Sequence, residues 1–558
     1  MASMAARDGD AEDVPQEAGE LAPVIALRDL TRARRRNRAA GVDVFQGFYQ
    51  AYVTAFGCAV ALLLSSDAIG DVRLDASQVH QVTVHGPGLI GLGVALVLAL
   101  GVRSGSRGGP LVLPAADVRH VLLAPVPREQ ALRRPAVRQV RFSSFVGMVV
   151  GAALGVLASH RLPGGLPGWA AVGAGVGAVT GAAAAAVGLA VCGRRIKPWL
   201  GLLMAVALIA WSGVDVALGR VTSPMGLLGR LAVIPLSFSP GDLAVILLPL
   251  VVIVAGVLGI GGMSLEQAER RATLASQIRF ALTLQDLRTV VLLRRQLTQE
   301  QPRPRPWIRL RSLGAGKRVV WRRDVRGLMR WPAVRLLRLF GLGVIAGLAL
   351  LGSWAGTTPL IVVAALALFL AGLEAVEPLA QDVDHPDLPA SAPVVHGELR
   401  IGHAPVPFAV MVLVGLVGWA TAIVVGAAGA FPVHLALTVG PSLVLTGALL
   451  GLVGALASVV MEPPSGGSDL LPAEIAGVKL VVRAIWAPAI VVVGLTPLFI
   501  ARSALQHGTA PGPAAASGSI LPLMVGVLGL GWLRFREDVH EYLKAGTAPP
   551  PAKPAGAT

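Results

Sequence analysis

Long uninterrupted apolar runs are the feature that most constrains this chain. They continue for about 20 residues at a stretch, the length that an α-helix needs to cross a bilayer, and they do not alternate as the strands of a membrane barrel do. Because no water reaches the hydrocarbon core, each backbone N–H and C=O there needs an internal partner, which a helix supplies. We therefore predict an all-α polytopic integral membrane protein with about 12 transmembrane helices.

The composition agrees with a bilayer as the main solvent. Of the 558 residues, 54% are hydrophobic and 14% are charged, and the mean hydropathy is +0.69. A formal net charge of +16 would suggest a nucleic-acid partner for a soluble protein. Here the arginines cluster between apolar runs, as the positive-inside rule predicts for cytoplasmic connections. We therefore expect the chain to have the lipid bilayer as a partner and to bind no nucleic acid.

The predicted spans are apolar runs with polar or basic boundaries. Basic runs at Arg34–Arg36 and at Arg194–Arg195 place these connections, and with them both termini, in the cytoplasm. Abundant arginine with few lysines indicates a GC-rich bacterial genome, so the expected location is the bacterial plasma membrane. The twelve predicted spans lie at 44–65, 87–103, 142–160, 168–192, 198–219, 242–262, 336–354, 358–377, 406–428, 434–459, 484–503 and 517–534.

Two groups of six spans flank a basic stretch that has no spanning run, which suggests two parallel six-helix repeats. The glycines of the fourth span, Gly173, Gly175, Gly177 and Gly181, predict close helix packing. The predicted parts are a cytoplasmic N-terminal tail with an interfacial basic segment (1–43), a first six-span permease half (44–262), a basic cytoplasmic linker (263–335), a second six-span permease half (336–534) and a disordered cytoplasmic C-terminal tail (535–558).

Two cytoplasmic loops carry a motif. The loop after the second span reads Leu-Leu-Ala-Pro-Val-Pro-Arg-Glu at 122–129, and the loop after the eighth repeats Ala-Pro-Val at 392–394. These loops resemble those of permease subunits of type-2 ABC exporters, and the whole chain resembles large twelve-span permeases of actinobacteria. The resemblance implies that a short helix in each loop docks on a separate ABC ATPase subunit, present in two copies. The implied coupling residues are Pro125, Val126, Arg128, Glu129, Pro393, Val394, His396 and Glu398.

The alternative for both loops is an ordinary solvated connection whose arginines only set the topology. The second loop departs from the first, because His396 stands where the first has Arg128.

Residues for catalysis are not visible. A phosphate-binding loop ends in Lys followed by Ser or Thr, and the nearest match, Gly-Ala-Gly-Lys-Arg at 314–318, lacks the earlier glycine and the hydroxyl. We therefore expect no enzyme activity in this chain, with ATP bound and hydrolysed by the partner subunit. Cys58 and Cys192 have no metal-ligand spacing, so neither a metal nor another cofactor is expected.

Acidic residues within predicted spans are functional candidates, because charge is costly there, and three of them are considered. Asp215, in the fifth span, is a candidate for the transport path, with an interfacial residue as the equal alternative. Glu374 and Glu377, at the inner end of the eighth span, are expected to pair with loop arginines.

The predicted function is the membrane-spanning permease subunit of an ABC-type exporter for an unknown substrate. One alternative is a secondary active transporter of the major facilitator type, which also has six plus six spans. Against it, the loop between the second and third spans is long and lacks the Gly-x-x-x-Asp-Arg-x-Gly-Arg pattern of that family. The other alternative is a membrane scaffold that transports nothing.

Overall fold

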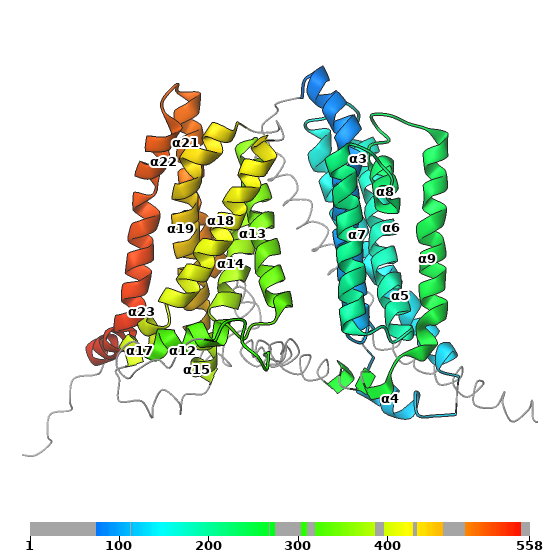
Figure 1. The fold of residues 1–558 in the computed structure, drawn as a ribbon, viewed down its shortest axis with the longest axis horizontal. Helices are drawn as coiled ribbons and strands as arrows, with labels where there is room; N and C mark the ends of the chain where they lie inside the picture. Colours follow the sequence, from blue (N-terminus) through cyan, green and yellow to red (C-terminus); the bar gives the residue numbers. More distant parts are fainter. Residues whose placement is uncertain are drawn as a thin grey trace, which may run out of the picture. The chain divides into compact units, whose positions relative to one another are not determined.

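The computed structural model describes residues 74–273 (without 112, 126, 267 and 270), 303–309, 319–384, 396–427, 432–460 and 486–547. The predicted first span at 44–65 and Cys58 lie outside these residues. The described residues form helices with no strand among them, which confirms the all-α prediction (Figure 1). Among them, nine helices are long and apolar enough to cross a membrane, or up to eleven if each of two bent pairs is one span. The chain is therefore a multi-pass membrane protein.

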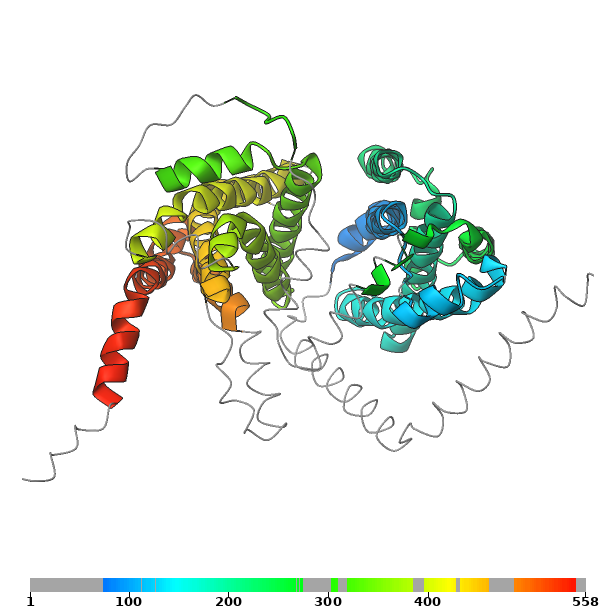
Figure 2. The same cartoon turned by 90° about the horizontal axis from the view of Figure 1, so that it is seen from below.

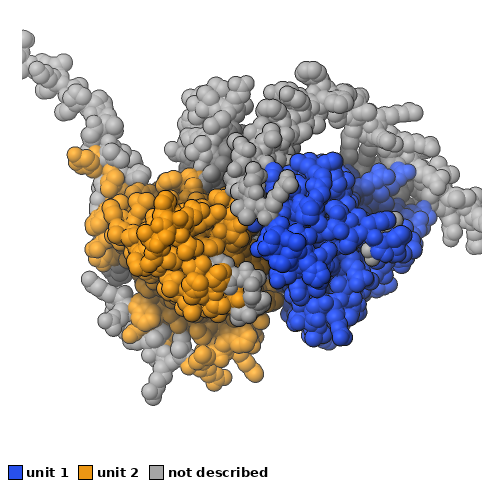
Figure 3. All heavy atoms as spheres, turned by 90° about the horizontal axis from the view of Figure 1, so that it is seen from above, with its two compact units in different colours: residues 1–297 blue, residues 298–558 orange. Residues whose placement is uncertain are grey.

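The chain divides into two compact units, residues 1–297 and 298–558, coloured separately in Figure 3. This division falls inside the predicted linker at 263–335. Each unit is a helix bundle with an apolar core of its own.

Among the described residues of unit 1, five helices are long and apolar enough to cross a membrane. They run along the bundle, and shorter helices lie toward its ends (Figure 1). We call the end that holds α4 and the first turn of α5 the basic end of unit 1. The elements are α3 (Ala76–Ser106), α4 (Ala115–His120), α5 (Arg128–Ser159), α6 (Leu166–Gly193), α7 (Pro198–Leu218), α8 (Pro224–Ala232), the 3₁₀ helix η1 (Pro240–Ile246), α9 (Leu247–Leu258) and the 3₁₀ helix η2 (Gly259–Gly262).

Helix α3 begins earlier than the predicted span at 87–103. Asp75 starts it with a capping box: the Gln78 N–H donates to Asp75 Oδ1 at 2.8 Å, and the Asp75 N–H donates to Gln78 Oε1 at 3.2 Å. The Gln78 N–H also lowers the pKa of Asp75. A polar first turn can extend a helix beyond the apolar run, and hydropathy alone does not detect such a turn.

Helices α5 and α6 pack backbone to backbone. A Cβ added to Gly177 would lie 2.1 Å from the Gly147 carbonyl oxygen, and one added to Gly151 would lie 2.1 Å from that of Gly173. Gly181 is as close to Ser143, so three of the four predicted glycines serve helix packing. Gly175 does not, because an added Cβ there would meet nothing within 4 Å.

Helix α6 is also the centre of unit 1. Helix α3 approaches it at Gly101, where an added Cβ would lie 2.3 Å from the Ala184 carbonyl oxygen. Helix α9 approaches it at Gly256, where the corresponding distance to the Ala186 carbonyl oxygen is 2.3 Å. Such close approaches are typical of membrane helices, which gain little from burying one apolar side chain against another.

In unit 2, the long helices run side by side in roughly the same direction (Figures 1 and 2). Helices α12, α15 and α17 lie at one end of this bundle, which we call the basic end of unit 2 (Figure 1). The core includes the fully buried Met411, Leu450, Leu452, Leu456 and Leu495. The helices are α12 (Val319–Leu328), α13 (Ala333–Trp354), α14 (Leu360–Ala375), α15 (Glu377–Asp384), α17 (His396–Gly402), α18 (Pro405–Ala427), α19 (Val433–Val460), the segment Trp486–Gly494, α21 (Thr496–Gln506), α22 (Pro511–Gly518) and α23 (Ile520–Thr547).

In unit 2, three predicted spans differ from the observed helices. The eighth bends by 60° between α14 and α15, next to Pro378, and the eleventh bends by 40° before α21, next to Pro497. Proline lacks the N–H that would continue the helical ladder, so both breaks have a local cause. The last span continues as α23 to Thr547, into the predicted tail at 535–558.

Candidate functional site

The loop after α3 is packed against the basic end of unit 1. Leu111, Leu113, Val118 and Leu122 are each at most 7% exposed, and they join one apolar cluster with residues of α5, α6 and η2. This loop therefore has a fixed position beneath the bundle, and the motif at 122–129 starts from a buried residue.

The opposite side of the same loop faces away from the bundle. Leu123 is 64% exposed, and Arg119, Pro125 and Arg128, which lie within five residues of it in the sequence, are exposed as well. Helix α5 starts at Arg128, directly after Pro127. A proline at this place favours the start of a helix, because its fixed φ suits the first turn. The result is an exposed leucine among basic residues, which we call the Leu123 surface (Leu123, Pro125, Arg128, with Arg119 beside them).

Of the predicted coupling residues in this loop, Glu129 is also exposed, and its side chain lies against Gly261. Val126 lies outside the described residues.

Polar contacts tie this loop to the start of the linker. The Arg271 guanidinium donates to the Arg107 carbonyl oxygen at 3.0 Å, and burial lowers the pKa of this guanidinium. Arg119 and Glu269 form an exposed ion pair at 3.7 Å. The loop and the segment that follows α9 are therefore joined at several points.

The second predicted coupling loop is described only at its end. Pro393 and Val394, and the side chain of His396, lie outside the described residues. Glu398 is exposed on α17. Helix α17 packs on α23 so closely that a Cβ added to Gly397 would lie 2.1 Å from the Arg534 carbonyl oxygen. Helix α17, at the end of the second predicted coupling loop, is thus held against α23, the last long helix of unit 2.

A buried ionic cluster joins three elements at the basic end of unit 2. His403, between α17 and α18, has no exposed surface. Its Nδ1 lies 2.6 Å from Asp324 Oδ2 on α12, and its Nε2 lies 3.0 Å from Asp382 Oδ2 on α15. Arg323 donates to both oxygens of Asp382, at 2.9 and 3.0 Å. Because both ring nitrogens face carboxylates, the geometry fits a doubly protonated imidazolium.

Sequence reasoning missed this cluster. Its acids and its histidine come from positions 324, 382 and 403, which no short motif connects. The available signal was the basic, tryptophan-containing sequence around α12, which by itself gives no partner for Asp324.

A second ionic cluster holds Glu374 and Glu377, which pair with arginines as predicted, although these arginines lie in the first turns of α13 and not in a loop. Arg335 pairs with Glu374 at 3.3 Å and with Glu377, and its guanidinium lies 3.8 Å from the centre of the Trp331 ring. Arg338 pairs with Glu374 at 2.8 Å. Trp331 also accepts a hydrogen bond from Trp307 Nε1 through its carbonyl oxygen, at 2.9 Å. The start of α13 is therefore anchored to the bend between α14 and α15.

Asp215 is buried at the end of α7 away from the basic end of unit 1, with 2% of its surface exposed. Its carboxylate accepts the N–H of Thr222 at 3.1 Å and the N–H of Ser223 at 2.7 Å, as well as the Thr222 hydroxyl. Ser223 in turn caps α8 through Gly226 N–H at 3.0 Å. Asp215 thus orients the connection from α7 to α8.

Asp215→Asn is expected to lower the free energy of unfolding by about 1.5–3 kcal/mol, because an amide has one acceptor oxygen where the carboxylate uses two. Thermal unfolding of the purified chain measures this change. An Asn variant that is as stable as the wild type but transports less would instead assign Asp215 to the transport path.

Within the described ranges, no group of three or more His, Cys, Asp or Glu side chains is arranged to hold a metal ion. Comparison with protein-family models, with curated proteins and with solved structures finds no match to this chain.

Proposed function

We propose that the chain is the membrane-spanning permease subunit of an ABC-type exporter, which moves a substrate across the plasma membrane with ATP hydrolysed on a separate ATPase subunit. The main observation in support of this proposal is the Leu123 surface. It combines an exposed apolar side chain with a cationic surround, on a loop whose other side is buried in the core of unit 1. A partner that pushes on such a loop pushes on α5 and α6 directly.

The charges support a cytoplasmic position for both basic ends. In unit 2, six arginines lie between residues 322 and 338. By contrast, the segments that join α13 to α14 and α18 to α19, at 355–359 and 428–432, contain no Lys, Arg, Asp or Glu. This asymmetry is what the positive-inside rule predicts. In unit 1, the arginine-rich stretch at 103–141 carries the Leu123 surface, and the same rule predicts a cytoplasmic position for it.

Leu123→Asp is expected to reduce copurification of the ATPase by at least about tenfold, because burying a leucine at an interface contributes about 1.5–3 kcal/mol. The experiment expresses the tagged full-length chain in its own host and quantifies copurified ABC ATPase by mass spectrometry. Arg128→Glu should act in the same direction, through loss of attraction to an acidic ATPase surface.

The matched control is Arg138→Glu, an exposed arginine that lies about 15 Å further along α5. It makes the same charge change away from the Leu123 surface and should leave copurification unchanged. Failure to copurify any ABC ATPase with the wild type, or equal yields from wild type and Leu123→Asp, would contradict the proposal.

One observation favours a second candidate, a secondary active transporter of the major facilitator type. The His403 cluster is a buried titratable group beside a spanning helix, as proton-coupled transporters use. Substrate uptake into vesicles that follows an imposed pH gradient without ATP, and that is lost in His403→Gln, would select this candidate over the exporter.

A further inference from the structure

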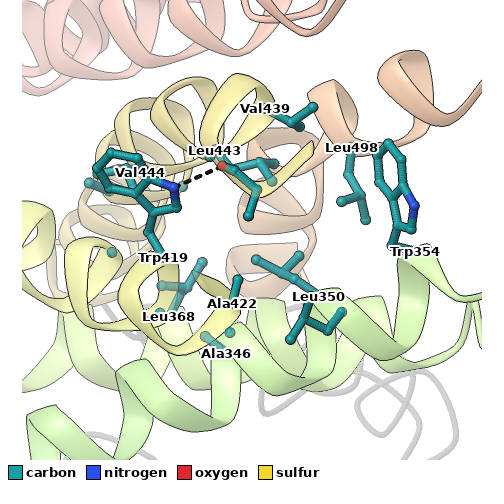
Figure 4. A pocket seen from close by; sticks show the side chains of 18 of the residues that line it. Ala346, Leu350, Trp354, Leu368, Trp419, Ala422, Val439, Leu443, Val444 and Leu498 are labelled. Carbon is teal, nitrogen blue, oxygen red and sulfur yellow. Dashed lines mark hydrogen bonds between the residues drawn. The ribbon is translucent and has the colours of Figure 1, made fainter. Parts of the chain in front are cut away.

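Unit 2 contains an apolar cavity away from its basic end. It lies between α13, α14, α18, α19 and α21 and has a volume of about 70 Å³ (Figure 4). Trp354 and Leu498 line one side, and Trp419 and Val444 line the other. The Trp419 indole N–H is already used, since it donates to the Ala436 carbonyl oxygen at 2.8 Å.

The lining is mostly apolar and offers water few partners. All twenty lining residues are Gly, Ala, Val, Leu or Trp. A space of this size exceeds what a single water needs, but a water requires two or more polar partners, and apolar cavities instead take apolar ligands. In a bilayer the available apolar ligand is an acyl chain.

A cation stands beside this cavity. Arg502 follows Leu498 by one turn of α21, and its NH1 donates to the Ser353 carbonyl oxygen at 3.2 Å, next to Trp354. The Ser353 side chain is 1% exposed, and its hydroxyl has no hydrogen-bond partner in the described part of the chain. The charged group therefore lies at the level where α13 ends.

In the part of unit 2 that the structure describes, Arg502 carries the formal charge at the end away from the basic end. His434 and His507 are the other titratable side chains among the described residues there. The three segments that join the long helices there, at 355–359, 428–432 and 507–510, contain no Asp or Glu. An anionic group placed at Arg502 thus meets no carboxylate in these segments.

We propose that this cavity binds one acyl chain of an anionic phospholipid, whose phosphate lies at Arg502. The apolar lining takes the chain, and Arg502 selects the headgroup. The two tryptophans suit the same position, since indoles gather where apolar and polar layers of a bilayer meet. The inference requires only that unit 2 lies in a bilayer, and it holds whether or not an ATPase binds the chain.

The test uses the full-length chain in vesicles that contain a phospholipid with a photoactivatable diazirine in its acyl chain, as phosphatidylglycerol or as phosphatidylcholine. Mass spectrometry locates the cross-linked peptides. The cavity segments at 346–354, 414–422 and 435–448 should be labelled about fivefold more by phosphatidylglycerol, since one arginine near the surface contributes about 1 kcal/mol. Their labelling should saturate as the probe fraction rises, whereas labelling at the exposed Leu528 on α23 should rise linearly.

Two pairs of variants test separately the contribution of the acyl chain and that of the lipid headgroup. Ala422→Phe places a ring in the cavity from its wall and should displace about two methylenes of the bound acyl chain. Labelling of the cavity segments should then fall about tenfold, because each buried methylene contributes about 0.8 kcal/mol to binding. Ala420→Phe adds the same ring at an exposed position of the same helix and should change nothing. Arg502→Gln should abolish the preference for phosphatidylglycerol, and Arg502→Lys should keep it.

Linear labelling of the cavity segments in the wild type would overturn the site without reference to any variant, as would unchanged labelling in Ala422→Phe. Saturable labelling that is equal for the two lipids would overturn the anionic part of the proposal. Neither outcome depends on ATPase copurification, so this inference and the proposed function fail separately.

Discussion

Gly177→Ala is expected to lower the free energy of unfolding by about 1–3 kcal/mol, the usual cost of forcing an extra methyl group into a packed interface. The added Cβ would lie 2.1 Å from the Gly147 carbonyl oxygen, which is backbone and cannot rotate away. The two helices must therefore separate along their whole contact. Thermal unfolding of the purified chain, followed by circular dichroism, measures the loss.

Gly175→Ala is the matched control for this prediction. It makes the same substitution two residues away, where an added Cβ meets nothing within 4 Å. Because alanine favours a helix more than glycine does, this variant should be as stable as the wild type or more stable by up to about 1 kcal/mol. Equal effects at the two positions would show that helix propensity, and not the α5–α6 contact, controls stability here.

His403→Ala is expected to lower the free energy of unfolding by about 3–5 kcal/mol, the range seen when one partner of a buried ion pair is removed. The substitution leaves Asp324 and Asp382 facing each other without the imidazolium between them, although Arg323 still pairs with Asp382. Chemical denaturation of the purified chain measures this change, and proteolysis near α12 reports whether that helix detaches.

His434→Ala provides the comparison, because this histidine is exposed and its loss should change stability by less than about 0.5 kcal/mol. A triple variant that combines His403→Ala with Asp324→Asn and Asp382→Asn should recover part of the lost stability, since it removes the unpaired charges. If the triple variant is less stable than His403→Ala alone, the cluster does not act through charge compensation.

Hydropathy predicted the long helices well, because the cost of an unpaired backbone group in lipid leaves few alternatives to a helix. Where the predicted span boundaries were wrong, helix capping or proline determined the observed boundary. Helix α3 starts early because Asp75 caps a polar turn, and the eighth span bends where Pro378 interrupts the backbone ladder. Both signals are local, and a search for caps and prolines at the ends of spans would have found them.

The candidate sites were harder to predict than the helices. The motif at 122–129 indicated a surface loop, but only the structure shows that Leu122 is buried while Leu123 is exposed. The His403 cluster and the Arg502 position depend on contacts between residues far apart in sequence. Such contacts follow from how the helices pack, and a single sequence does not encode them in any short pattern.

The packing around α6 has a mechanical consequence. Because α3, α5 and α9 all meet it through glycines, these interfaces contain few side-chain torsions that could rearrange. Helix α8 belongs to the same group, because a Cβ added to its Gly229 would lie 2.0 Å from the Pro87 carbonyl oxygen of α3. These five helices should therefore move as one rigid body, and a change of shape in unit 1 is most easily taken up by α7. A spin label on α7 should then change its distance to α5 between functional states, while a pair of labels on α5 and α6 should not.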